Sequence, residues 1–303
     1  MVQGPGAGPL VLERLAPGQV GGPYDRFGLT PLGVTIGARI DGIDLADVDD
    51  ATFADLQRAG REWKVLFFRD QHLSLEQHAA FADRWGTLTD DTLLGVAAPD
   101  PIDNVVVFTR DEHTAGYENL WHADGTFRPV PTAGTILRAI EVPEVGGDTL
   151  FADLAAAYDN VPEPLRTRLR TMRARHDWSK GAYAEKYGDR LAELRALHPP
   201  AEHPVVVRHP ATGRDTLLVN RLFTTAIVGV DPAESDEILA MLFALPTIPE
   251  LQVRWHWEPG SVAFWDNVAC QHYGANDYFP RRRVMARTTF FSRDWDRLEP
   301  AAP

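Results

Sequence analysis

The chain has 303 residues, of which 44% are hydrophobic, with a formal net charge of −13 and a single cysteine, Cys270. The hydrophobic content is enough for a sizeable core and excludes a wholly disordered chain. A lone cysteine excludes an intramolecular disulfide and a thiolate metal cluster. The acidic balance argues against nucleic acid and anionic membranes as partners, since the basic cluster at 281–283, with Arg287, is short.

The first residues lack the basic and apolar stretches of a secretory signal, and no apolar run approaches the roughly 18 residues that span a membrane. We therefore expect a cytoplasmic protein without a membrane partner. Residues 1–26 contain six glycines and four prolines without periodicity, which predicts a flexible arm. Because neither a repeat nor a low-complexity linker follows, residues 27–303 are expected to form a single domain.

Strands and helices are indicated by hydrophobic periodicity, caps and turn residues. Alternating or short apolar runs predict strands over 33–45, 64–70, 104–110, 133–143, 203–210 and 215–220. Helical patterns cover 49–63, 74–86, 153–161, 163–172 and a segment that begins at Asp231. Residues 251–273 are expected to form a hairpin, with a further strand within 281–294. This order predicts a mainly β, α+β fold in which a β-sandwich or barrel is wrapped by helices.

His122 and Asp124 lie two positions apart between Trp121 and Phe127. On an extended segment their side chains point to the same side, so an imidazole nitrogen and a carboxylate oxygen can converge. Such donors suit ferrous iron in a site of two histidines and one carboxylate. A pair of this kind is more often structural, however, and a third ligand is needed. His272 is a candidate, with a packed core histidine as the alternative.

Two arginines follow in the segment 281–294. If it is a strand, Arg283, Met285 and Arg287 share one face, which would point into a barrel. Buried guanidinium groups require anions, and their geometry suits carboxylates, sulfonates or phosphates. The alternatives are an exposed edge strand kept basic and pairing with acidic side chains.

Taken together, these motifs resemble the taurine dioxygenase-like (TauD/TfdA) family of iron(II)- and 2-oxoglutarate-dependent oxygenases. The resemblance runs from about residue 27 to residue 292. The motifs that carry it are "LFFRDQHLS", "WHADGTF", "GGDTLFAD", "HPVVVRHPATGRDTLLVN" and "PGSVAFWDNVACQHYGANDYFPRRRVMARTTF". It implies a double-stranded β-helix (jelly-roll) core flanked by helices.

The resemblance also implies the cofactor residues. His122, Asp124 and His272 correspond to the iron(II) ligands of the family, and Thr149 and Arg283 correspond to the residues that hold the distal carboxylate of 2-oxoglutarate. Dioxygen would be the cosubstrate. The protein would therefore oxidise a substrate C–H bond while 2-oxoglutarate is converted to succinate and carbon dioxide.

For the substrate, the resemblance implies Arg287 as the contact to an anionic group and Phe223 as an aromatic pocket wall. Asp91 and Glu118 stand where the taurine enzyme has a histidine and an asparagine. Acidic groups close to an anion would repel it, which makes taurine doubtful. We therefore expect Asp91 or Glu118 to contact an amine or polyol end of the substrate.

The leading hypothesis is hydroxylation, with or without subsequent C–S, C–O or C–N cleavage or desaturation, of a small anion. The candidates are a sulfonate, a sulfate ester, a phosphonate or an amino or carboxylic acid. The alternative is a biosynthetic oxygenase of secondary metabolism that acts on an amine-containing acid. A metal hydrolase and a non-catalytic β-barrel binding protein are more distant alternatives. The resemblance further implies a homodimer or homotetramer.

Overall fold

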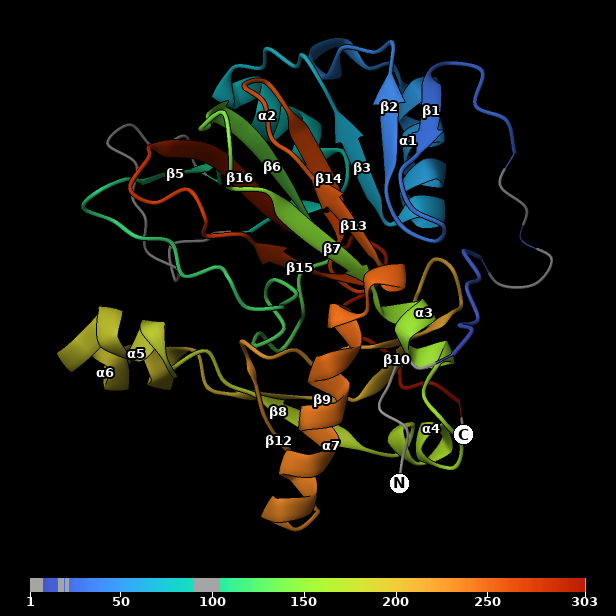
Figure 1. The fold of residues 1–303 in the computed structure, drawn as a ribbon, viewed down its shortest axis with the longest axis vertical. Helices are drawn as coiled ribbons and strands as arrows, with labels where there is room; N and C mark the ends of the chain where they lie inside the picture. Colours follow the sequence, from blue (N-terminus) through green and yellow to red (C-terminus); the bar gives the residue numbers. More distant parts are fainter. Residues whose placement is uncertain (1–7, 16–18, 20–21, 90–103, 303) are drawn as a thin grey trace.

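A computed structural model of the chain (Figure 1) describes residues 8–15, 19, 22–89 and 104–302. Within these residues the large sheet has eight strands, ordered β1-β2-β3-β14-β6-β16-β4, with β5 also paired to β16. Their bounds are β1 Gly28–Pro31, β2 Ala38–Asp41, β3 Val65–Phe68, β4 Thr87–Leu88, β5 Val106–Arg110, β6 Gly134–Glu141, β14 Val262–Asp266 and β16 Arg283–Phe291.

A second sheet, with the order β13-β7-β15, lies against the large one. It comprises β13 Gln252–Trp255, β7 Thr149–Asp153 and β15 Cys270–Gly274. Side chains from both sheets meet in one interior cluster, which contains Phe67, Trp265 and Met285 from the large sheet and Phe151 and Trp255 from the second. Two packed sheets around a shared core form the expected mainly β, jelly-roll architecture, so the predicted fold class is confirmed.

Two helices cover the outer face of the large sheet (Figure 1): α1, Asp50–Trp63, and α2, Leu75–Asp83. Asp49 caps α1, and α2 begins with a capping box of Ser74 and Gln77, a pattern that the sequence predicts. The helix α2 ends before the predicted limit at Gly86. A Cβ at Gly86 would lie 2.2 Å from the Phe291 carbonyl oxygen, because the chain already runs against β16 there.

The remaining elements form a second region below the sandwich (Figure 1). One sheet has the order β12-β8-β9, and β10 pairs with β11. The strands are β8 Arg173–His176, β9 Ala201–Pro204, β10 Val206–Arg208, β11 Asp215–Leu217 and β12 Thr224–Ile227. The helices are α3 Leu154–Asp159, α4 Leu165–Leu169, α5 Ala182–Tyr187, α6 Leu191–Leu197 and α7 Pro232–Ala244, with short 3-10 turns η3 Gly188–Arg190, η4 Leu245–Thr247 and η5 Pro249–Leu251. A further 3-10 turn, η1 Leu45–Asp47, lies between β2 and α1.

The predicted hairpin over 251–273 is wrong. The segment contains three strands, but β13 and β15 both pair with β7, whereas β14 pairs with β3 and β6 in the other sheet. The strand β14 is apolar on both faces: Phe264 contacts the helix-covered cluster and Trp265 the interior cluster. Such a strand buries more apolar surface at the centre of the large sheet than beside its neighbours in sequence.

Part of the predicted N-terminal arm contacts the domain. Leu10 and Leu12 pack against the cluster formed around α3 and α7. The backbone of Val11 exchanges two hydrogen bonds with the Asn160 side chain, at 2.8 and 2.9 Å. Residues 8–15 therefore have defined contacts in the structure. No helix within the described part of the chain is long and apolar enough to cross a membrane.

Candidate functional site

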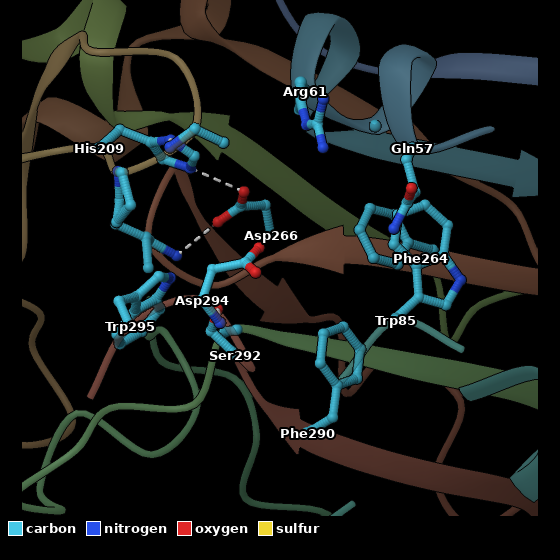
Figure 2. Close-up of a pocket in the computed structure, with 15 residues that line it drawn as sticks. Gln57, Arg61, Trp85, His209, Phe264, Asp266, Phe290, Ser292, Asp294 and Trp295 are labelled. Carbon is cyan, nitrogen blue, oxygen red and sulfur yellow. Dashed lines mark hydrogen bonds and ion pairs between the residues drawn. The ribbon is translucent and has the colours of Figure 1, made fainter. Parts of the chain in front are cut away.

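A hollow between α1, the end of β14 and the loop at 209–211 contains a histidine and a carboxylate in contact (Figure 2). His209 Nε2 lies 2.8 Å from Asp266 Oδ2, and His209 Nδ1 accepts the backbone N–H groups of Ala211 and Thr212. Asp266 Oδ1 accepts the N–H groups of Val268 and Ala269. Every polar atom of the pair has a partner, so the pair fixes two loops and is not poised for chemistry.

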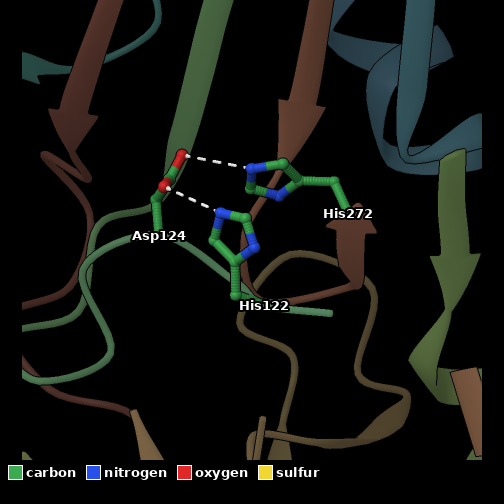
Figure 3. A group of neighbouring side chains, drawn as sticks. All are labelled: His122, Asp124 and His272. Carbon is green, nitrogen blue, oxygen red and sulfur yellow. Dashed lines mark ion pairs between the residues drawn. The ribbon is translucent and has the colours of Figure 1, made fainter. Parts of the chain in front are cut away.

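A second group of side chains has the donor set expected for a metal (Figure 3). One ligand atom each from His122, Asp124 and His272 lies within 4.8 Å of the others. The Nε2 atoms of His122 and His272 are 4.0 and 3.9 Å from the two Asp124 carboxylate oxygens. All three side chains are buried. Of the described residues, no other group of histidine, cysteine and carboxylate ligands meets in this way.

Backbone pairing brings the two histidines together although 150 positions separate them. His122 and His272 form an antiparallel bridge, with N–H···O distances of 3.0 and 2.7 Å. His122 Nδ1 lies 2.6 Å from the Leu120 carbonyl oxygen. A carbonyl accepts only from N–H, so Nδ1 carries the proton and Nε2 is left with a lone pair for a metal.

The Asp124 carboxylate is oriented by the large sheet. The Thr135 hydroxyl donates to Asp124 Oδ2 at 2.8 Å, and the Asn267 amide in turn donates to Thr135 Oγ1 at 2.9 Å. The backbone N–H of Asp124 donates to Asn267 Oδ1. Strand β6 therefore holds the carboxylate, whereas β15 carries His272.

Charges at the site are set by burial and by neighbours. Burial alone raises the pKa of Asp124, but His272, Arg287 and His122 outweigh it, and the pKa lies below its ordinary value. Burial, with His122 nearby, lowers the pKa of His272 to about 3. An ionised carboxylate and a neutral imidazole are the forms that bind divalent metals.

A pocket opens beside the His122–Asp124–His272 cluster. It is lined by Val106, Phe108, Arg110, Tyr117, Glu118, His122, Asp124, Tyr183, Leu222, Phe223 and Arg287. Three residues assigned to the substrate from the sequence, Arg287, Phe223 and Glu118, therefore meet here. Arg287 Nη1 is 3.9 Å from Asp124 Oδ1, which places the guanidinium next to the cluster. The fourth, Asp91, lies outside the described residues.

The strand β16, which carries both arginines, is not an edge strand: it pairs with β6 on one side and with β4 and β5 on the other. Arg283 is 8% exposed, and its Nε atom is buried without a hydrogen-bond partner among the described residues. Gly147, whose φ of 75° favours glycine, lies beside it: a Cβ there would be in ordinary contact with that Nε, at 3.4 Å. The basic-edge alternative is therefore wrong.

Thr149 lies two residues beyond Gly147, at the beginning of β7. It is buried, and its hydroxyl accepts the indole N–H of Trp257 at 2.9 Å. In the part of the chain that the structure describes, neither Thr149 nor Arg283 lines the pocket that contains Arg287. Arg283 nevertheless lies opposite Arg110 in the β5–β16 pair, so the residues assigned to 2-oxoglutarate lie next to one end of that pocket.

Glu118 has a partner that the sequence did not reveal. Arg110 Nη2 donates a hydrogen bond to Glu118 Oε1, and the Tyr117 N–H donates to Oε2 at 2.9 Å. Sequence reasoning also missed Tyr183 of α5 as a pocket wall. Arg110 could have been found from the strand pattern, because Val106, Phe108 and Arg110 alternate along β5 and share one face.

Comparison with known proteins identifies the family. Residues 28–289 match the family "Taurine catabolism dioxygenase TauD, TfdA family". A (S)-phenoxypropionate/alpha-ketoglutarate-dioxygenase of Sphingobium herbicidovorans is 38% identical over 86% of this chain and 93% of its own. An alpha-ketoglutarate-dependent sulfate ester dioxygenase of Pseudomonas putida is 37% identical, over 86% of this chain and 87% of its own.

A solved taurine dioxygenase from Burkholderia xenovorans superimposes with a TM-score of 0.75 at 34% identity, covering 92% of this chain and 97% of its own. With the buried His122–Asp124–His272 cluster, these matches decide against the metal-hydrolase and binding-protein alternatives. The chain belongs to the TauD/TfdA family and is an Fe(II)- and 2-oxoglutarate-dependent dioxygenase.

Proposed function

We propose that His122, Asp124 and His272 bind the iron of this dioxygenase. The observation that carries the assignment is the meeting of two Nε2 atoms and one carboxylate within 4.8 Å in a buried site. Two histidines and one carboxylate on one side of a ferrous ion leave open positions for 2-oxoglutarate and dioxygen. When bound, these groups supply the oxidising power that breaks a substrate C–H bond.

Thr149 and Arg283 are proposed to hold the distal carboxylate of 2-oxoglutarate. The buried Arg283 Nε without a partner among the described residues supports this, since burying an uncompensated cation is costly. A carboxylate that accepts from a guanidinium and a hydroxyl would remove that cost and fix the cosubstrate in one orientation.

The substrate is proposed to be an anion with an apolar body. Arg287 supplies a cation next to Asp124, so an anionic head bound there places the neighbouring carbon atoms close to the metal ligands. The pocket walls are mostly apolar, with Val106, Phe108, Leu222 and Phe223 among them. Aryloxyalkanoates and alkyl sulfate esters combine these features, and relatives named for phenoxypropionate and for sulfate esters point the same way.

The amine-containing acid is less well supported, because the Glu118 carboxylate already binds Arg110. The homodimer or homotetramer, the single domain over 27–303 and the cytoplasmic location stay predictions. Sedimentation velocity on the purified protein distinguishes the two assemblies.

Anaerobic addition of Fe(II) and 2-oxoglutarate tests the proposal. Wild-type protein should develop a weak visible metal-to-ligand charge-transfer band. The band should be lost in His272→Ala and kept in His113→Ala, which alters an exposed histidine that is not one of the proposed ligands. A wild-type protein without the band would overturn the assignment.

The substrate contact is tested separately by succinate release with aryloxyalkanoates and alkyl sulfates. The rate in Arg287→Met should be at least tenfold lower than the wild-type rate.

A further inference from the structure

The strand β5 forms one wall of the substrate pocket and carries a cation at its end. Val106, Phe108 and Arg110 alternate along the strand and all line the pocket. Antiparallel pairing with β16 places Val106 opposite Arg287 and Arg110 opposite Arg283. Val106 and Arg110, at the two ends of this wall, are four positions apart, which corresponds to about 14 Å along the strand. A molecule held at Arg287 can therefore extend along β5 towards Arg110.

At this far end, Arg110 and Glu118 form an ion pair, and the two side chains differ in how exposed they are to solvent. The Arg110 side chain is 7% exposed and the Glu118 side chain 34%. Both side chains line the pocket, and the Arg110 guanidinium lies near the rings of Phe108 and Tyr117. Arg110 Nε is buried and has no hydrogen-bond partner among the described residues, so Glu118 is its principal countercharge.

We propose that the Arg110–Glu118 pair selects substrates whose far end is uncharged. An ammonium group there would be attracted by Glu118 but repelled by Arg110. A carboxylate would be attracted by Arg110 but repelled by Glu118. Since the two contributions oppose each other, neither charge recovers the hydration that it loses in the pocket. An apolar end loses nothing of this kind and gains from burial against Phe108 and Tyr117.

This inference deepens the proposed function and depends on its anionic head at Arg287. It predicts opposite effects for the two members of the pair. Glu118→Gln removes the negative charge and leaves Arg110 to attract an anionic end. Arg110→Met removes the positive charge while keeping an apolar side chain of similar length, and leaves Glu118 to attract an ammonium end.

The test uses three linear acids with the same head: octanoate, 8-aminooctanoate and octanedioate. Their dissociation constants are measured by anaerobic calorimetry on the protein loaded with Fe(II) and 2-oxoglutarate. Wild-type protein should bind octanoate most tightly. Relative to octanoate, octanedioate should gain on the order of tenfold in Glu118→Gln, and 8-aminooctanoate a similar factor in Arg110→Met.

The double variant Arg110→Met/Glu118→Gln should again prefer octanoate, because it lacks both charges. Structural damage at the pocket would instead weaken all three ligands and would not be reversed by the second substitution. The inference would be overturned if both single variants changed the affinity for octanedioate and 8-aminooctanoate, relative to octanoate, in the same direction. It would also be overturned if wild-type protein bound none of the three acids. If the charge-transfer band itself fails to form, the proposed function is at fault and not the pair.

Discussion

At the scale of single residues, the geometry of the iron site depends on a side chain that does not belong to it. Asp124 accepts a hydrogen bond from Thr135, and Asn267 fixes Thr135 while its own Oδ1 accepts the Trp265 indole N–H at 3.0 Å. The carboxylate is therefore oriented before a metal arrives. Partners of this kind typically affect metal affinity by about 10- to 100-fold.

Thr135→Val should weaken Fe(II) binding by about that factor, because the isosteric methyl group cannot donate to Asp124 Oδ2. Thr135→Ser keeps the hydroxyl and should bind Fe(II) within about threefold of wild type. The measurement is an anaerobic Fe(II) titration in the presence of 2-oxoglutarate, followed by the charge-transfer band. Equal affinities in the two variants would show that the hydrogen bond does not position the carboxylate.

The sequence allowed part of this site to be predicted. The spacing of His122 and Asp124 placed both on one side of the chain, and the alternation around Met285 placed Arg283 and Arg287 on one face. The Arg110–Glu118 pair could not be predicted in the same way. Arg110 is in a strand and Glu118 is in the segment that follows it. The distance between them is set by the turn that joins the two and not by a periodic pattern.

At the scale of elements, α2 packs against the large sheet with a fully buried histidine, His78. Burial, reinforced by the nearby Arg138 guanidinium, lowers the pKa of His78 to about 3. In the unfolded chain the imidazole has its ordinary pKa of about 6.5. Between these values the unfolded state binds a proton that the folded state does not, so stability should fall as the pH drops from about 6.5 towards 3.

His78→Leu should therefore flatten the acid side of the stability profile, by about 3 kcal/mol between pH 6.5 and pH 4. Above pH 7 the two proteins should show the same pH dependence. The check is urea unfolding of wild type and variant at pH 8, 6, 5 and 4, with chelator present so that metal binding does not contribute. The other buried histidines contribute equally to the pH dependence of both proteins and so do not affect the difference between them. If the free energy of unfolding changed with pH in the same way in both proteins, His78 would not be buried in its neutral form.

Element boundaries were more predictable than element partners. The capping box of Ser74 and Gln77 placed the beginning of α2 correctly, because capping is a local interaction. The pairing of β13, β14 and β15 is decided by which sheet buries both faces of each strand. That depends on β3, β6 and β7, which lie far away in sequence, and so the expected hairpin was wrong.

At the scale of the whole molecule, the iron site joins the two layers of the sandwich. His272 belongs to β15 of the smaller sheet, and His122 is paired to it. Asp124 is held through Thr135 by β6 of the large sheet. A metal bound by all three would therefore cross-link the layers, and its binding free energy would add to the stability of the folded protein.

Saturating Fe(II) under anaerobic conditions should accordingly raise the free energy of unfolding by about 2.7 kcal/mol at a free metal concentration 100 times its Kd. The measurement is guanidinium unfolding with and without Fe(II). His272→Ala should lose most of the increase, whereas His113→Ala should retain it, since that histidine is exposed. An increase of equal size in His272→Ala would mean that the metal stabilises the protein from elsewhere and that the cross-link between the sheets is not its cause.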